Sequence, residues 1–152
     1  MPKVKVAIMG CGGMAGAHAR RLKPNPDVQI VGLTDVDEPR VQAFIDRHLA
    51  DSDSKPAIFT DAARMYSDAK PDAVVIVTPH TLHFEHGMQA LNAGCHVLME
   101  KPMVTDSGQA HELAAHVKKT GKILTIGYNT PCTPEFKSVS YTHLTLPTIL
   151  RV

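Results

Sequence analysis

The chain has 152 residues, which is enough for one domain with a real core and too few for two full domains. Hydrophobic residues make up 43% and charged residues 20%, a composition typical of a soluble globular protein. The formal net charge of +1 offers no basic excess for nucleic acid or for an acidic membrane surface. Cys11, Cys95 and Cys132 show no metal-ligand spacing, and no apolar run approaches the roughly 20 residues of a transmembrane helix. We therefore expect a cytoplasmic protein with reduced thiols and no membrane segment.

A glycine-rich turn follows the first expected strand, residues 4–9, and precedes a helix expected over about 14–22. From Gly10 to Ala15 the turn has the spacing G-x-G-x-x-A. In a dinucleotide site Gly10 allows the sharp turn, Gly12 lets a pyrophosphate approach the backbone, and Ala15 lets the helix pack closely. At Gly13 and Met14, N–H groups without intrahelical partners suit a phosphate. A glycine turn with no ligand role is the alternative.

A second strand is expected over residues 28–33, and Asp35 follows it, 23 residues after Gly12. That spacing favours a carboxylate that accepts the adenosine ribose hydroxyls. Capping of the next helix, expected over about 39–49, is the alternative role, for which Asp37 is the better candidate. Asp35 would repel a 2′-phosphate, which favours NAD; NADP stays open because Arg40 lies five residues after Asp35.

Strands and helices then continue to alternate. Strands are expected over 57–59, 73–77, 96–99 and 123–126, and helices over 61–69 with Thr60 as N-cap, 82–93, and 106–120 with Asp106 and Gln109 as a capping box. This alternation predicts an α/β fold with a doubly wound parallel sheet. Ligands of such sheets bind at the carboxyl ends of the strands, where the polar and glycine-rich residues of this chain gather.

The sequence resembles the Gfo/Idh/MocA-type NAD(P)-dependent oxidoreductases, which include glucose–fructose oxidoreductase and myo-inositol 2-dehydrogenase. The resemblance covers about residues 3–137. Besides the glycine turn, the segments that carry it are Thr78-Pro79-His80-Thr81-Leu82-His83, Ala90 to Val97 leading into Glu100-Lys101-Pro102, and Gly127-Tyr128-Asn129.

The resemblance implies the cofactor-binding half of a two-domain dehydrogenase. It makes Lys101 the candidate catalytic residue, beside the nicotinamide and the substrate carbinol, with a solvated surface lysine as the alternative. It also implies that Glu100 accepts from the nicotinamide ribose. Further expected cofactor contacts come from Thr78, Pro79, His80 and His83, with Tyr128 and Asn129 bordering the substrate side.

Two positions depart from the family pattern. His80 stands where an asparagine is frequent, and Thr130-Pro131-Cys132 stands where an arginine and an aromatic residue are frequent. His80, His83 and His86 recur every three residues, but zinc would need supporting carboxylates and only Glu85 is near, so we expect no metal. We expect His18 to pack or to lie beside the cofactor.

Residues 1–137 are expected to form the dinucleotide-binding domain, and residues 138–152 a non-native or disordered tail. The family's C-terminal α/β substrate domain is expected to be missing, so this chain alone should be inactive or nearly so. In the complete parent, whose oligomeric state stays open and could be a homo-oligomer, we expect hydride transfer to or from a sugar, cyclitol or similar small molecule. A non-catalytic NAD-binding or sensing module is the main alternative. An S-adenosylmethionine methyltransferase is disfavoured, since methyl transfer has no need of Glu100-Lys101-Pro102.

Overall fold

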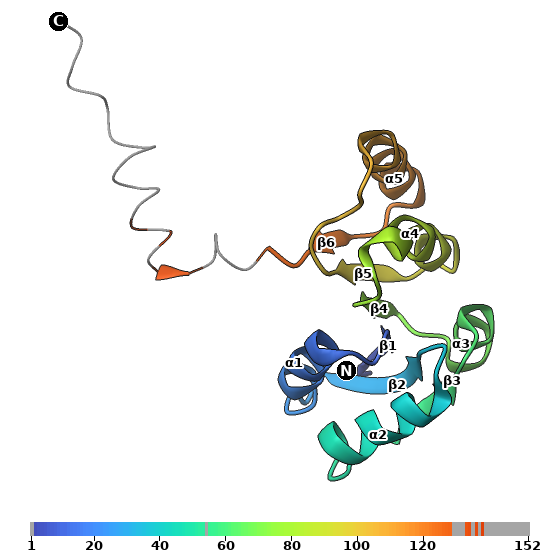
Figure 1. Cartoon of the computed structure of the whole chain (residues 1–152), viewed down its shortest axis with the longest axis vertical. Helices are drawn as coiled ribbons and strands as arrows, with labels where there is room; N and C mark the ends of the chain where they lie inside the picture. Colours follow the sequence, from blue (N-terminus) through green and yellow to red (C-terminus); the bar gives the residue numbers. More distant parts are fainter. Residues whose placement is uncertain (1, 54, 129–132, 135, 137, 139–152) are drawn as a thin grey trace, which may run out of the picture.

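The computed structural model describes residues 2–53, 55–128, 133, 134, 136 and 138. Its centre is a six-stranded sheet in the order β3-β2-β1-β4-β5-β6, with every neighbouring pair parallel (Figure 1). The strands are β1 (Val4–Met9), β2 (Val28–Thr34), β3 (Ala57–Phe59), β4 (Ala73–Ile76), β5 (His96–Met99) and β6 (Leu124–Ile126). The predicted doubly wound parallel sheet is therefore confirmed.

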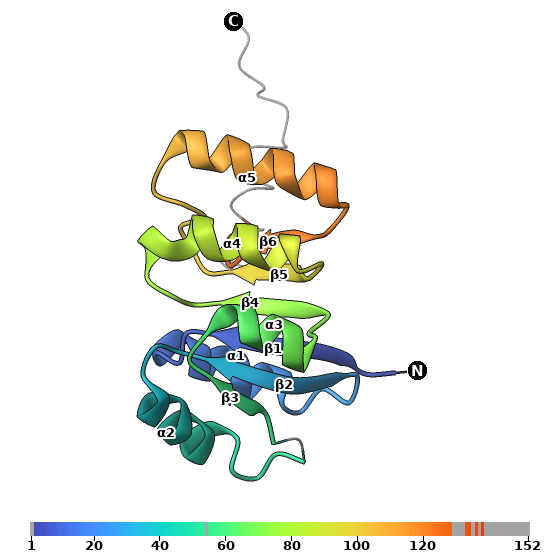
Figure 2. The same ribbon diagram turned by 90° about the vertical axis from the view of Figure 1, so that its right-hand side faces the viewer.

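Helices cover both faces of the sheet, as Figures 1 and 2 show. One apolar cluster lies under α1 and α2, around Ile8, Leu33 and Phe44. The second cluster lies under α3, α4 and α5, around Met65 and Leu113. Burial of both faces explains why the central strands read as continuous apolar runs. The helices are α1 (Gly13–Leu22), α2 (Glu38–His48), α3 (Ala62–Ala69), α4 (His83–Asn92) and α5 (Ser107–Thr120), with one 3₁₀ turn at His80–Leu82.

The strand order changes direction between β1 and β4, which are paired although more than 60 residues separate them. From this point the chain winds one way through β2 and β3 and the other way through β5 and β6. The loops after β1 and β4 diverge from each other here, which leaves a crevice at the carboxyl ends of the strands. The fold therefore places the glycine turn and the loop after β4 on opposite sides of one crevice.

The helix starts agree only in part with the sequence-based expectation. Helix α3 begins after Asp61, whose carboxylate accepts from the backbone N–H of Arg64 at 2.8 Å, so Asp61 is the N-cap in place of Thr60. Asp37 does stand at the N-cap of α2, yet its side chain makes no capping bond. The helix expected from residue 82 is preceded by the 3₁₀ turn, and Asp106 caps α5 as predicted by accepting from Gln109.

The predicted boundary between a domain at 1–137 and a tail at 138–152 lies almost entirely outside the described residues. It stays a prediction. In the part of the chain that the structure describes, no helix has the length and apolar character needed to cross a membrane.

Candidate functional site

Gly10 makes the turn that ends β1, and any side chain would be strained there. Its φ is +92°, a backbone conformation that L side chains rarely adopt. A Cβ built on Gly10 would lie 2.8 Å from the carbonyl oxygen of Val77, in the loop after β4. The Gly10 N–H also donates to the Thr34 carbonyl at 2.7 Å. The turn is thus pressed against the ends of both neighbouring strands.

The next two glycines face open space. A Cβ on Gly12 or Gly13 would meet no atom within 4 Å, and both residues are exposed. Gly12 is the N-cap of α1 and supplies no capping side chain, so the N–H groups of the first turn stay available. Ala15 is fully buried in the core under α1, and Met14 is exposed. These positions leave room for a phosphate at the N-terminus of α1, where the helix dipole favours an anion.

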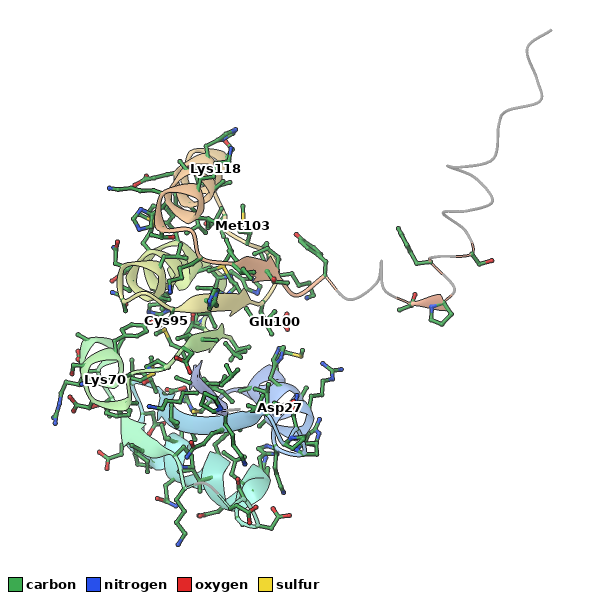
Figure 3. The ribbon with its side chains drawn as sticks, turned by 180° about the vertical axis from the view of Figure 1, so that it is seen from behind. Asp27, Lys70, Cys95, Glu100, Met103 and Lys118 are labelled. Atoms are coloured by element: carbon green, nitrogen blue, oxygen red, sulfur yellow. The ribbon has the colours of Figure 1, made fainter. Side chains whose placement is uncertain are left out.

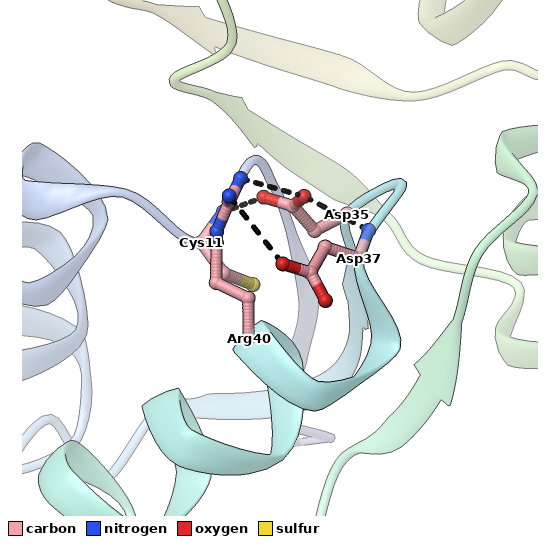
Figure 4. A network of polar contacts seen from close by, with 4 residues as sticks. All are labelled: Cys11, Asp35, Asp37 and Arg40. Carbon is pink, nitrogen blue, oxygen red and sulfur yellow. Dashed lines mark hydrogen bonds and ion pairs between the residues drawn. The ribbon is translucent and has the colours of Figure 1, made fainter.

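Asp35 links the end of β2 to the glycine turn (Figure 4). Its Oδ2 accepts from the backbone N–H of Cys11 at 2.9 Å, and its Oδ1 accepts from the N–H of Asp37 at 3.2 Å. Arg40 places Nη1 3.2 Å from Asp35 and Nη2 3.4 Å from Asp37. Burial and then the charge of Asp35 raise the pKa of the Cys11 thiol to about 12, so this thiol is neutral and unreactive at neutral pH.

A groove of about 460 Å³ runs along these strand ends. On one side it is lined by the glycine turn and Asp35, and on the other by the loop after β4; the lining residues include Gly10, Gly12, Asp35, Thr78, Pro79 and His86. A hollow of about 590 Å³ lies near the amino ends of β1 and β2, among Lys3, Lys23 and Gln29. Ligands of parallel α/β sheets bind at carboxyl ends, so the first groove is the candidate site.

The loop after β4 presents Thr78 and Pro79 to the groove, and α4 adds His86, which the sequence analysis considered only as a metal ligand. The Oγ1 of Thr78 lies 2.9 Å from Nδ1 of His86. Burial lowers the pKa of His86, Glu85 opposes this change, and His83 adds to it. His86 is therefore a neutral ring that fixes the Thr78 hydroxyl at neutral pH.

His83, one of the predicted cofactor contacts, lies in the core. Its side chain is fully buried, and its two ring nitrogens lie at hydrogen-bond distance from the carbonyl oxygens of Pro102 and Thr78. The ring thus serves two loops and has no nitrogen left for a ligand. His80, in contrast, is exposed on the 3₁₀ turn.

Beyond the end of β5, Glu100 turns toward α1 (Figure 3). Its Oε1 lies 2.9 Å from Nε2 of His18, and both side chains are close to nine-tenths buried. Its Oε2 accepts from the N–H of Lys101 at 3.3 Å, across a strand end whose Lys101–Pro102 peptide bond is cis. Lys101 itself is exposed, and no ion pair engages it within the described residues.

The last predicted strand end joins the same edge. Gly127 lies against the Glu100 carboxylate, since a Cβ built on it would be 3.2 Å from Oε1. Tyr128 follows and is exposed, whereas Asn129 lies outside the described residues. Glu100, Lys101 and Tyr128 thus follow the carboxyl ends of β5 and β6. Asp35 follows the carboxyl end of β2, on the other side of the β1–β4 crevice.

Sequence reasoning missed the partner of Glu100. His18 and Glu100 are separated by 82 positions, and no local pattern connects them. The available signal was the apolar face of α1, where Ala15, His18 and Ala19 are all buried at helical spacing. A histidine on such a face requires a polar partner from another element.

The three histidines from 80 to 86 do not converge. The rings of His80 and His83 meet edge to face with centroids 5.5 Å apart, and His86 turns to Thr78. Residues 2–53 and 55–128, with the few described positions after them, contain no group of three His, Cys, Asp or Glu side chains that could hold a metal ion.

The fold and this edge together define a dinucleotide-binding Rossmann domain. A family model described as "Oxidoreductase family, NAD-binding Rossmann fold" matches residues 4–128. The chain belongs to this Gfo/Idh/MocA oxidoreductase family, and the matched part is its NAD-binding domain.

Individual relatives agree with this placement. D-glucoside 3-dehydrogenase of Escherichia coli K12 is 33% identical over 127 residues, which are 83% of this chain and 35% of that protein. The scyllo-inositol 2-dehydrogenase (NADP(+)) IolU of Bacillus subtilis 168 is 26% identical over 136 residues, 90% of this chain and 40% of that protein. GenD2 from gentamicin A biosynthesis, solved in complex with NAD, superposes with a TM-score of 0.83 at 30% identity over 93% of this chain and 39% of that one. The chain thus spans between about a third and two fifths of these relatives.

Proposed function

We propose that this domain binds NAD for a dehydrogenase that acts on a hydroxyl or carbonyl group of a sugar, cyclitol or similar small molecule. The observation that carries the proposal is that Gly12, Asp35 and Thr78 line one groove at the carboxyl ends of the strands. Glu100-Lys101 follows the neighbouring strand β5. The names of relatives, which include a glucoside and an inositol dehydrogenase, support the substrate class.

The residues present fit a dinucleotide. The open space beside Gly12 and Gly13 admits a pyrophosphate, and the exposed N–H groups of α1 would donate to it. Asp35 keeps a lone pair on Oδ2 besides the one that accepts from Cys11, which suits a ribose hydroxyl. When bound, the nicotinamide exchanges a hydride with a carbinol or carbonyl carbon.

Lys101 is our candidate for the catalytic residue. Its ammonium group, exposed beside the end of β5, would donate a hydrogen bond to the reacting oxygen and hold it for proton transfer. Glu100 is held by His18, which fixes the backbone that carries Lys101. In this arrangement Thr78 and Pro79 would line the cofactor, and Tyr128 and Asn129 would border the substrate.

We further propose that turnover requires residues beyond those of this chain, because the chain spans only 35% of D-glucoside 3-dehydrogenase. Assay of the purified 152-residue protein with NAD and a panel of polyols tests this point. Robust turnover by the chain itself would contradict it.

The decisive experiment is titration of NADH and NADPH into the 152-residue chain, followed by nicotinamide fluorescence. We expect NADH to bind about tenfold more tightly, a difference of about 1.4 kcal/mol. The preference is modest because Asp35 repels a 2′-phosphate but Arg40 partly neutralises the charge of Asp35. Tighter binding of NADPH would contradict the NAD assignment, and binding of neither would contradict the cofactor role.

Gly12→Val is the matched control for this titration. Its side chain would fill the open space at the turn, so affinity for NADH should fall by at least about tenfold. Because nothing lies within 4 Å of the built Cβ, the free energy of unfolding should change little. In a full-length parent, Lys101→Ala separates an enzyme from a sensing module: lost turnover with retained NAD affinity favours the enzyme.

A further inference from the structure

The imidazole of His83 lies between two backbone carbonyl groups. Its Nδ1 is 2.7 Å from the carbonyl oxygen of Pro102, and its Nε2 is 3.0 Å from that of Thr78. The side chain is 0% exposed, so no solvent reaches either nitrogen. Each ring nitrogen therefore faces a carbonyl acceptor.

The number of N–H donors that the two contacts require indicates the protonation state of the imidazole. A carbonyl oxygen only accepts, and a neutral imidazole carries a single N–H. In the neutral form one of the two short contacts would set a nitrogen lone pair against an oxygen lone pair. The imidazolium form donates at both ends, and two charge-assisted bonds to carbonyl oxygens offset part of the cost of its burial.

The two carbonyl groups belong to the two loops that carry the candidate site. Thr78 follows β4 and Pro102 follows β5, and these strands are neighbours in the sheet. Thr78 lines the groove, and Pro102 directly follows Lys101. The ring thus joins the loop that lines the groove to the loop that presents the lysine.

Helix α4 gives the ring a rigid base. His83 is its first residue, and Gly87 one turn later packs so closely that an added Cβ would lie 2.8 Å from Cε of Met99 in β5. Two other titratable rings adjoin the His83 ring, His80 at 5.5 Å between centroids and His86 on the Thr78 hydroxyl. The close packing of α4 leaves the His83 ring little freedom to leave either carbonyl.

We propose that His83 is a positioning residue: as an imidazolium it clamps the Thr78 loop to the Pro102 loop and so holds Lys101 in place after the end of β5. The importance of Lys101 rests on the proposed function, whereas the protonated clamp stands on the geometry alone. Its chemical signature is therefore measurable without cofactor or turnover.

The first test reads the ring directly in the 152-residue chain. Long-range proton–nitrogen NMR spectra distinguish an imidazolium from either neutral tautomer. In the imidazolium both ring nitrogens are protonated and have similar chemical shifts, whereas in a neutral tautomer only one nitrogen is protonated. Because both ring nitrogens lie at hydrogen-bond distance from carbonyl oxygens, we expect the imidazolium pattern for His83. A single neutral tautomer would overturn the proposal, and this measurement needs no variant that must fold.

The second test separates the two ends of the clamp. In His83→Asn the amide nitrogen takes the place of Nδ1 and can still donate to Pro102; in His83→Gln it takes the place of Nε2 and can still donate to Thr78. The Gln variant loses the bond to Pro102, so we expect the Lys101 amide signal to shift and the Thr78 amide signal to stay in place. The Asn variant loses the bond to Thr78, so we expect the Thr78 amide signal to shift and the Lys101 amide signal to stay in place. His111→Asn, at an exposed histidine of α5, is the matched control and should move neither signal.

The crossed pattern distinguishes a clamp from an ordinary core histidine. Equal disturbance of both loops in both variants, or of neither loop, would overturn the positioning role. Failure of the chain to bind NADH would contradict the proposed function and leave the ring spectrum and the crossed pattern unaffected.

Discussion

The carboxylate of Asp35 accepts a hydrogen bond from the backbone N–H of Cys11, with 2.9 Å between Oδ2 and the nitrogen. The end of β2 and the glycine turn after β1 are therefore one bonded unit. A ligand that places a ribose at Asp35 and a phosphate at the turn would meet two groups whose separation is already fixed. Such preorganisation lowers the entropic cost of binding.

Asp35→Asn tests this unit. The amide keeps an oxygen that can accept from Cys11 but loses the charge that suits ribose hydroxyls and repels a 2′-phosphate. We expect affinity for NADH to fall about tenfold, or about 1.4 kcal/mol, with little loss for NADPH. Parallel fluorescence titrations measure both. Asp46→Asn, on the exposed face of α2, is the control, and an unchanged ratio of NADH to NADPH affinity in the Asp35 variant would contradict the prediction.

Gly10 and Gly94 form a matched pair for backbone strain. Both have positive φ, +92° and +79°, but only Gly10 has an atom in the path of a Cβ. Gly94→Ala should cost about 1–2 kcal/mol of unfolding free energy. Gly10→Ala should cost at least about 1 kcal/mol more, because the Val77 carbonyl must shift. Urea denaturation measures both, and equal losses would show that the contact with Val77 relaxes freely.

His18 and Glu100 should be energetically coupled. Each side chain is largely buried against the other, so removal of either leaves a polar group without its partner. In a double-mutant cycle with His18→Ala and Glu100→Ala, we expect a coupling energy of about 1 kcal/mol. Unfolding by urea supplies the four free energies. Additive losses would mean that the two residues act independently.

Stability should decline in alkaline solution because of Cys11. Burial, and then Asp35, raise the pKa of its thiol from a usual value of 9.0 to about 12. Above about pH 9 the unfolded chain releases this proton and the folded chain keeps it, so the contribution is fully present below that pH and is lost as pH rises toward 12. The urea midpoint should fall between about pH 8 and about pH 10.

Cys11→Ala provides the control for that profile. It should show a smaller alkaline decline, with a remainder from Tyr66 and Cys95, whose pKa values are also raised, chiefly by burial. Identical slopes for the parent and the variant would assign the decline to other groups.

The sheet, its strand ends and the role of Gly10 were predictable from sequence because each depends on local patterns. Apolar runs identify buried strands, and the G-x-G-x-x-A spacing describes a turn that has little freedom to differ. The family model then confirms the resemblance that rests on Glu100-Lys101-Pro102. The individual cofactor contacts stay predictions, since they concern a ligand that must be bound to test them.

Side-chain direction was less predictable. His80, His83 and His86 look equivalent in sequence, yet a 3₁₀ turn at His80–Leu82 places the first ring outside α4 and lets the second enter the core. The partners of His83 lie on two loops whose approach depends on the pairing of β4 with β5. The Arg40 contact with Asp35 likewise depends on the first turn of α2 facing the glycine turn.

The strand order has a mechanical consequence. Residues of β1, β2 and β3 build one half of the sheet and those of β4, β5 and β6 the other, and among the described strands the halves pair solely through β1 and β4. The glycine turn and Asp35 belong to the first half, whereas Thr78 and Glu100 belong to the second. A dinucleotide lying in the groove would contact both halves and so stabilise their association. The contact between His18 of α1 and Glu100 after β5 already links the two halves in the same way.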